Sequence, residues 1–241
     1  MKHQQLIKTV FLAMMVALGV VISPILRVEG MCPMAHFINV TCAVLLGPYQ
    51  ALLCALLIGI LRMTFMSIPP LALTGAIFGA FLSGIFYRLS KGKLIWAFLG
   101  EVIGTGIIGA IVSYPVMTFI WGRNGLSWFF YVPSFIAGTL IGGSLAFIFL
   151  KQLAKLGLLT KFQQALGSAT YANESDVTNN ALAIGLFGFI AYLATVVIIN
   201  NFVPNPPLFT SYIKYAVFAV FVIAAVIYYI INRKKLSENA A

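Results

Sequence analysis

Acidic side chains are scarce in this sequence. Its 241 residues include five Asp and Glu against 15 Lys and Arg, and charged residues together make up 8%. A typical soluble domain is about 25% charged. Hydrophobic residues make up 61%, and the mean hydropathy is +1.02. This composition excludes an ordinary soluble domain and predicts a multi-pass protein of the cell membrane. The net charge of +10 does not predict nucleic-acid binding, because the basic residues lie at the ends of apolar runs.

Metal ligands and catalytic groups are equally few. The two histidines are His3 and His36, and Cys32, Cys42 and Cys54 show no C-x-x-C spacing. These residues predict no metal site, no disulfide and no cofactor, and they cannot supply a Ser-His-Asp triad. The sequence also lacks a G-x-x-x-x-G-K-[ST] phosphate loop, so the chain cannot couple ATP hydrolysis by itself. We therefore expect a protein that is not an enzyme.

Long apolar runs dominate what is present, and a transmembrane helix needs about 20 such residues. They predict an all-α, polytopic membrane bundle with helices over about 5–22, 36–46, 49–63, 71–89, 94–120, 127–153, 181–202 and 212–231. Gly47-Pro48 divides one long run into two helices, and Pro115 is expected to kink the fifth helix near Tyr114. The first helix has the basic start of a signal peptide. No small-residue cleavage site follows it, so we expect the helix to be retained.

Polarity divides the chain into four parts. We expect a six-helix membrane domain at 1–155, a polar cytoplasmic linker at 156–180, a two-helix membrane extension at 181–232 and a basic cytoplasmic tail at 233–241. With the N-terminus inside, 11 of the 15 Lys and Arg residues lie on the cytoplasmic side and four lie outside. The positive-inside rule therefore favours cytoplasmic N- and C-termini.

Glu101 is the only acidic residue within one of these apolar runs. A charge at membrane depth costs roughly 2.5–3.5 kcal/mol on insertion scales, so such a residue usually faces the protein interior and serves a function. Four glycines within residues 100–109 surround it, and glycines let helices approach closely. On a regular α-helix Glu101, Thr105 and Ile108 share one face. The stretch therefore predicts the wall of a small-molecule site.

Binding pockets are mostly apolar and contain a few placed polar groups. The residues that we predict to bind substrate are His36, Asn39, Arg62, Glu101, Thr105 and Tyr114. Other interpretations stay open for each of them. Glu101 could simply pair with His36, Arg62 could be an interfacial charge, and Tyr114 could belong to an aromatic belt.

Small residues form stripes on other predicted helices. Gly75, Gly79 and Ser83 share one face of the fourth helix, which favours close packing against a neighbour. Ala13 and Ala17 lie four residues apart on the first helix, a spacing that also occurs in ordinary membrane-helix packing.

Several stretches in conserved order resemble one family of membrane proteins. Residues 1–155 resemble the ThiW family, which is grouped with the substrate-binding S components of energy-coupling factor (ECF) vitamin transporters. The stretches that carry the resemblance are Pro33–Val40, Leu45–Pro48, Ile60–Arg62, Gly100–Gly109 and Tyr131–Phe135.

The resemblance implies a six-helix fold with a substrate site in its extracellular half and the first loop as a lid. It also implies partners, namely a transmembrane coupling subunit and two cytoplasmic ATPase subunits. In such proteins an Ala-x-x-x-Ala face of the first helix contacts the coupling subunit, and Ala13 and Ala17 match it. The implied substrate is hydroxyethylthiazole, the thiazole precursor of thiamine. S components usually end after six helices, so the last two helices depart from the family pattern.

The residues alone leave other functions open. One carboxylate and a few polar groups do not distinguish hydroxyethylthiazole from another thiamine-related or heteroaromatic vitamin. A stand-alone secondary transporter could be coupled to protons through Glu101, although the sequence shows no convincing inverted repeat. A membrane scaffold could use the glycines for packing alone, but this role leaves Glu101 unexplained.

Overall fold

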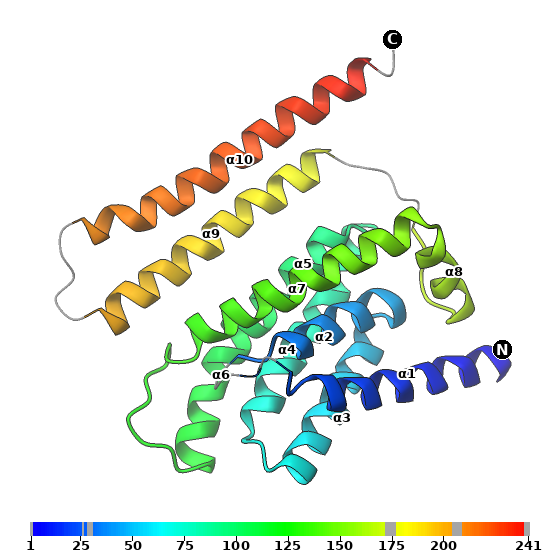
Figure 1. The fold of residues 1–241 in the computed structure, drawn as a ribbon, viewed down its shortest axis with the longest axis horizontal. Coiled ribbons are helices and arrows are strands. Elements are labelled where there is room, and N and C mark those ends of the chain that lie inside the picture. The colour runs from blue at the N-terminus through cyan, green and yellow to red at the C-terminus, as the bar shows by residue number, and fades with distance from the viewer. Residues whose placement is uncertain (1, 26, 28–30, 172–176, 204–208, 239–241) are drawn as a thin grey trace. The chain divides into compact units, whose positions relative to one another are not determined.

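The computed structural model describes residues 2–25, 27, 31–171, 177–203 and 209–238, and these are helical apart from the connecting turns (Figure 1). Seven helices of the described chain are long and apolar enough to cross a membrane. The predicted all-α polytopic bundle is thereby confirmed, and the chain is a multi-pass membrane protein. It divides into two compact units, Met1–Ala172 and Asn173–Ala241. The polar residues 173–176 of the predicted linker lie outside the described residues.

Five helical spans long enough to cross a membrane, one shorter apolar helix and one short helix build the described part of the first unit. They are α1 (Lys2–Ile22), α2 (Pro33–Leu46), α3 (Pro48–Met66), α4 (Leu71–Leu89), a composite span Leu94–Ile120, α7 (Val132–Lys155) and α8 (Leu158–Ala165). The composite span consists of α5 (Leu94–Glu101), η1 (Val102–Gly109), α6 (Ala110–Pro115) and η2 (Val116–Ile120). Helix α2 is the innermost helix, because it packs against α1, α3, α4 and α7 (Figure 1).

The predicted break at Gly47-Pro48 is confirmed. Gly47 adopts φ +89°, a left-handed conformation that favours glycine, and Pro48 begins α3 in the first turn, where proline is tolerated. The guanidinium of Arg88 occupies the space that a side chain at position 47 would need. Helix α2 therefore stays at 14 residues, too short to cross a membrane on its own.

The composite span differs from the kinked α-helix that we predicted. Its segments η1 and η2 are π-helical, with hydrogen bonds from residue i to i+5 and therefore more residues per turn than an α-helix. Gly100, Gly104 and Gly109 lie four and then five residues apart, and all three face α4. A Cβ at Gly104 would come within 2.6 Å of the Gly79 Cα. The wider turn keeps Gly109 on the same face as Gly104. The glycines of the composite span can therefore pack closely against the small residues of α4.

Helix α7 begins later than expected. We predicted a helix from residue 127, whereas α7 starts at Val132 after a turn over residues 128–131. Pro133 lies in the first turn of α7. A proline inside a longer helix would remove a hydrogen bond and clash with the preceding turn, so the helix starts beside it.

The segment that follows α7 returns to the first unit. Gly157 ends α7 in a left-handed conformation, and α8 follows at once. The buried side chain of Gln163 donates to the Val44 carbonyl oxygen (3.0 Å) and to the Tyr87 hydroxyl (3.0 Å). The beginning of the predicted linker is thus an ordered cap on the ends of α2 and α4.

The second unit is a helical hairpin. Helices α9 (Val177–Phe202) and α10 (Thr210–Glu238) lie side by side (Figure 1). The Asn180 amide donates to the Tyr228 hydroxyl (3.1 Å), and Tyr192 packs edge-on against Phe218. The turn residues 204–208 lie outside the described residues.

Candidate functional site

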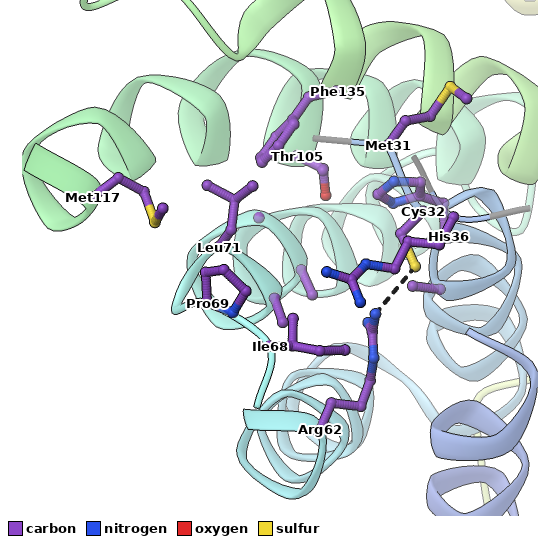
Figure 2. A pocket seen from close by; sticks show the side chains of 15 residues that line it. Met31, Cys32, His36, Arg62, Ile68, Pro69, Leu71, Thr105, Met117 and Phe135 are labelled. Atoms are coloured by element: carbon purple, nitrogen blue, oxygen red, sulfur yellow. Dashed lines mark hydrogen bonds between the residues drawn. The ribbon is translucent and has the colours of Figure 1, made fainter. Parts of the chain in front are cut away.

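A pocket opens at one end of the first unit (Figure 2). At this end α1, α3 and the composite span finish, and α2, α4 and α7 begin. The space measures about 610 Å³ including its open mouth. The residues that line it are Arg27, Met31, Cys32, Ala35, His36, Arg62, Ile68, Pro69, Leu71, Ala72, Gly75, Ala76, Thr105, Met117 and Phe135.

Polar and apolar groups lie on different sides of this pocket. Figure 2 shows Pro69, Leu71, Met117 and Phe135 on one side, and His36, Cys32 and Arg62 on the other. Such a division can hold an aromatic ring against carbon and sulfur atoms while hydrogen bonds fix its substituents.

A buried carboxylate organises the polar side. Oε1 of Glu101 accepts hydrogen bonds from His36 Nδ1 (2.9 Å), Asn39 Nδ2 (3.0 Å) and Thr105 Oγ1 (3.0 Å). Asn39 also donates to the Ala76 carbonyl oxygen (3.2 Å), which ties the cluster to α4. Charged acceptors make stronger hydrogen bonds than neutral ones, so the carboxylate fixes the His36 and Thr105 side chains that border the pocket.

Glu101 and Asn39 stand behind the pocket wall rather than in it. Glu101 is 0% exposed and is not among the lining residues. Its Oε2 has no hydrogen-bond partner among the described residues and lies beside Gly79. A Cβ at position 79 would come within 2.6 Å of that oxygen and would overlap Thr105 Oγ1. The absence of a side chain at Gly79 therefore makes room for the cluster.

Glycines of α7 place His36. A Cβ at Gly138 would lie 3.1 Å from His36 Nε2, and a Cβ at Gly142 would overlap the Pro33 carbonyl group. Since α7 approaches the start of α2 this closely, the His36 ring is held with Nδ1 on Glu101 and Nε2 on the side of α7. The ring is nearly buried and still borders the pocket.

One part of the predicted helix face is wrong. Thr105 bonds to Glu101 as expected, but Ile108 is 36% exposed and contributes nothing to the pocket. The expectation assumed a regular α-helix, whereas η1 carries more residues per turn. Seven positions after Glu101 the π-helix has rotated Ile108 away from the carboxylate.

Arg62 is a buried pocket residue and not an exposed interfacial charge. It is 3% exposed, although it lies in the last part of α3. Its Nη2 donates to Cys32 Sγ at 3.4 Å (Figure 2), and its Nε has no hydrogen-bond partner in the part of the chain that the structure describes. Cys32 in turn donates to the Ser23 carbonyl oxygen (2.9 Å), which links the two ends of the first loop.

The remaining predicted residues lie away from the pocket. Tyr114 packs against Trp128, with ring centroids 4.5 Å apart, and does not line the space. Ala13 and Ala17 are exposed on one side of α1. The structure thus brings together His36, Asn39, Glu101 and Thr105, places Arg62 across the same pocket and separates Tyr114 from it.

Sequence reasoning missed the apolar wall and the loop residues. Met117, Leu71 and Phe135 give no signal in a sequence that is mostly apolar. Cys32 was interpreted only through cysteine spacing, and nothing local predicts its contact with Arg62. The glycine spacing of four and then five residues after Gly100 was a usable signal for the π-helix.

The fold defines a polytopic membrane protein, and its first unit contains a pocket lined by apolar and polar side chains. Residues 9–156 match the family described as thiamine-precursor transporter protein (ThiW). This match covers more than half of the chain, so the chain belongs to the ThiW family. It confirms that the first six helices resemble the ThiW family, which is a family of transporters. Searches of curated proteins and of solved structures gave no match.

Proposed function

We propose that this protein is the S component of an ECF-type importer and that it binds hydroxyethylthiazole for uptake. The observation that supports this most directly is the pocket itself. On this proposal a heteroaromatic ring would lie against Leu71, Met117 and Phe135, and its polar substituents would face His36 and Thr105. The Glu101 carboxylate holds both polar side chains in place.

The orientation of the chain supports uptake from outside. The pocket lies at the end of the bundle where α1 finishes, which is the extracellular end if the N-terminus is cytoplasmic. The first loop contributes Arg27, Met31 and Cys32 to the pocket, as a lid over a substrate site would. On this proposal the loaded subunit turns in the membrane to release its ligand inward.

Calorimetry on purified protein tests the substrate. We expect wild type to bind hydroxyethylthiazole tightly, and thiamine and the pyrimidine precursor much more weakly. Glu101→Gln keeps the shape but replaces a charged acceptor with a neutral one, and should weaken binding about 10- to 100-fold. Tyr114→Phe is the matched control and should bind like wild type. If folded wild-type protein binds no thiazole, the proposed substrate is wrong. A preference for thiamine would favour the alternative that the protein takes up another thiamine-related vitamin.

Energy coupling requires partners, since the sequence has no phosphate loop. We propose that Ala13 and Ala17, exposed on α1, contact the transmembrane coupling subunit, which carries the two ATPase subunits. Exchanging both alanines for leucine should leave ligand affinity unchanged and abolish co-purification with the coupling subunit. Exchange of both for serine keeps the small surface and should preserve the complex. Intact association of the leucine variant would exclude this contact.

A further inference from the structure

Arg62 lines the pocket with a positive charge for which the described residues supply no carboxylate partner. Its side chain is 3% exposed, yet the described part of the chain gives its guanidinium only one hydrogen-bond acceptor, the Cys32 sulfur. Sulfur is a weak acceptor, and Nε is buried without a hydrogen-bond partner among the residues that the structure describes. A buried charge without a counter-ion is costly, so an isolated arginine at this position calls for an anion.

The buried carboxylate of Glu101 does not provide this anion. Its Oε1 accepts hydrogen bonds from His36, Asn39 and Thr105, and no arginine or lysine pairs with it among the described residues. A second arginine, Arg27, lines the same pocket and has no carboxylate partner among the described residues. The pocket wall therefore carries two guanidinium groups, while the one buried acid is engaged behind it.

We propose that the pocket binds an anionic ligand: a heteroaromatic ring that carries an oxyanion, either a phosphate monoester or a carboxylate. Arg62 is the ion partner of this group, and Arg27 adds a second positive charge. A guanidinium can donate two parallel hydrogen bonds to either kind of oxyanion, and the Arg62 guanidinium, held at the Cys32 sulfur, lines the pocket. This inference rests on the proposed function and extends it from a neutral alcohol to a charged ligand.

The pocket has a place for each part of such a molecule. Figure 2 shows Arg62 on the side of the cavity away from Phe135 and Met117. The ring would lie against these apolar side chains, with His36 and Thr105 bonding to its polar substituents. The oxyanion would replace the thiol of Cys32 as the acceptor of the Arg62 hydrogen bond.

Calorimetry with three related ligands tests the charge preference. The probes are hydroxyethylthiazole, its phosphate monoester and the analogue in which a carboxylate replaces the hydroxymethyl group. We expect wild type to bind at least one oxyanion 10-fold or more tightly than the alcohol. Arg62→Met should lower oxyanion affinity 10- to 100-fold and change alcohol affinity less than threefold. Arg123→Met, which removes an arginine outside the pocket, is the matched control and should retain the preference.

Cys32 provides a second measurement inside the same site. It is half-buried at the pocket, whereas Cys42 and Cys54 are fully buried, so N-ethylmaleimide should react with Cys32 first. Saturating oxyanion should slow this reaction in wild type and leave it unchanged in Arg62→Met. Phenyl phosphate, compared with benzyl alcohol, tests the anion preference without a thiazole.

The outcomes separate the two proposals. If the alcohol binds tightly and neither oxyanion binds more tightly, the proposal of an anionic ligand is refuted and the proposal of thiazole uptake still stands. If phenyl phosphate protects Cys32 but no thiazole compound binds, the anion site is supported and thiazole is refuted as the substrate. Absence of both binding and protection in folded protein refutes both. Among the oxyanions, the one with the higher affinity identifies the natural group as phosphate or carboxylate.

Discussion

Gly79→Ala is the most direct perturbation of the polar cluster, because it changes neither a charge nor a hydrogen-bonding group. The added Cβ would overlap Thr105 Oγ1 and come within 2.6 Å of Glu101 Oε2. Thr105 would have to turn away and lose its 3.0 Å hydrogen bond to the carboxylate. His36, bonded to the same carboxylate oxygen, would shift with it.

Three contributions set the expected loss of stability. Losing a hydrogen bond to a charged acceptor costs about 1.5–3 kcal/mol. Inserting a methyl group into a packed interior costs about 1–3 kcal/mol. Replacing a helical glycine by alanine offsets about 1 kcal/mol of this. The net destabilisation is therefore about 1.5–5 kcal/mol, which corresponds to a fall of about 3–20 °C in melting temperature for a unit of this size.

Thermal unfolding in detergent measures this loss, and calorimetry measures ligand affinity in the same samples. The control is Gly185→Ala in α9, where nothing lies within 4 Å of the added Cβ; it should be neutral or slightly stabilising. Thr105→Ala removes the oxygen that clashes, so Gly79→Ala should cost less in that background than alone. If Gly79→Ala is as harmless as Gly185→Ala, the packing of Glu101 against α4 described above is wrong.

Three further predictions concern the surroundings of the pocket. Gln163→Ala leaves the Tyr87 hydroxyl and the Val44 carbonyl oxygen without their hydrogen-bond donor. It should lower the free energy of unfolding by about 1–3 kcal/mol and leave ligand affinity unchanged. An unchanged melting temperature would contradict the capping role of α8. Tyr114→Ala removes the ring that packs on Trp128 and should affect melting but change ligand affinity less than threefold in calorimetry. A chain ending at Ala172 keeps the whole first unit and should bind ligand like the full chain; loss of binding by this folded truncation would mean that the second unit contributes to the site.

Most of the helical order could be predicted from hydropathy and proline. The break at Gly47-Pro48 needs a left-handed residue followed by one without an amide hydrogen, and both are visible in the sequence. The start of α7 was placed too early because Trp128 and its neighbours are apolar enough to extend a helix. The residues before Pro133 instead form turns, a choice that hydropathy alone does not reveal.

The polar cluster could be predicted because its members are rare. Glu101, His36 and Asn39 stand out in an apolar chain, and the pairing of Glu101 with His36 was one of the open interpretations. The pocket wall could not be predicted in the same way, because Leu71, Met117 and Phe135 resemble the many apolar side chains that face lipid. Their role follows from the meeting of helix ends and connecting loops at one end of the first unit, which is a property of the folded chain.

The positions of Glu101 and Arg62 relative to the pocket imply different roles for the two charges. Glu101 lies behind His36 and Thr105, so it acts on a ligand only by holding these side chains in place. Arg62 borders the space directly. A change at Glu101 should therefore weaken every ligand that uses His36 or Thr105, whatever its charge. A change at Arg62 should discriminate between ligands by charge, and this difference separates a residue that positions the site from one that contacts the bound molecule.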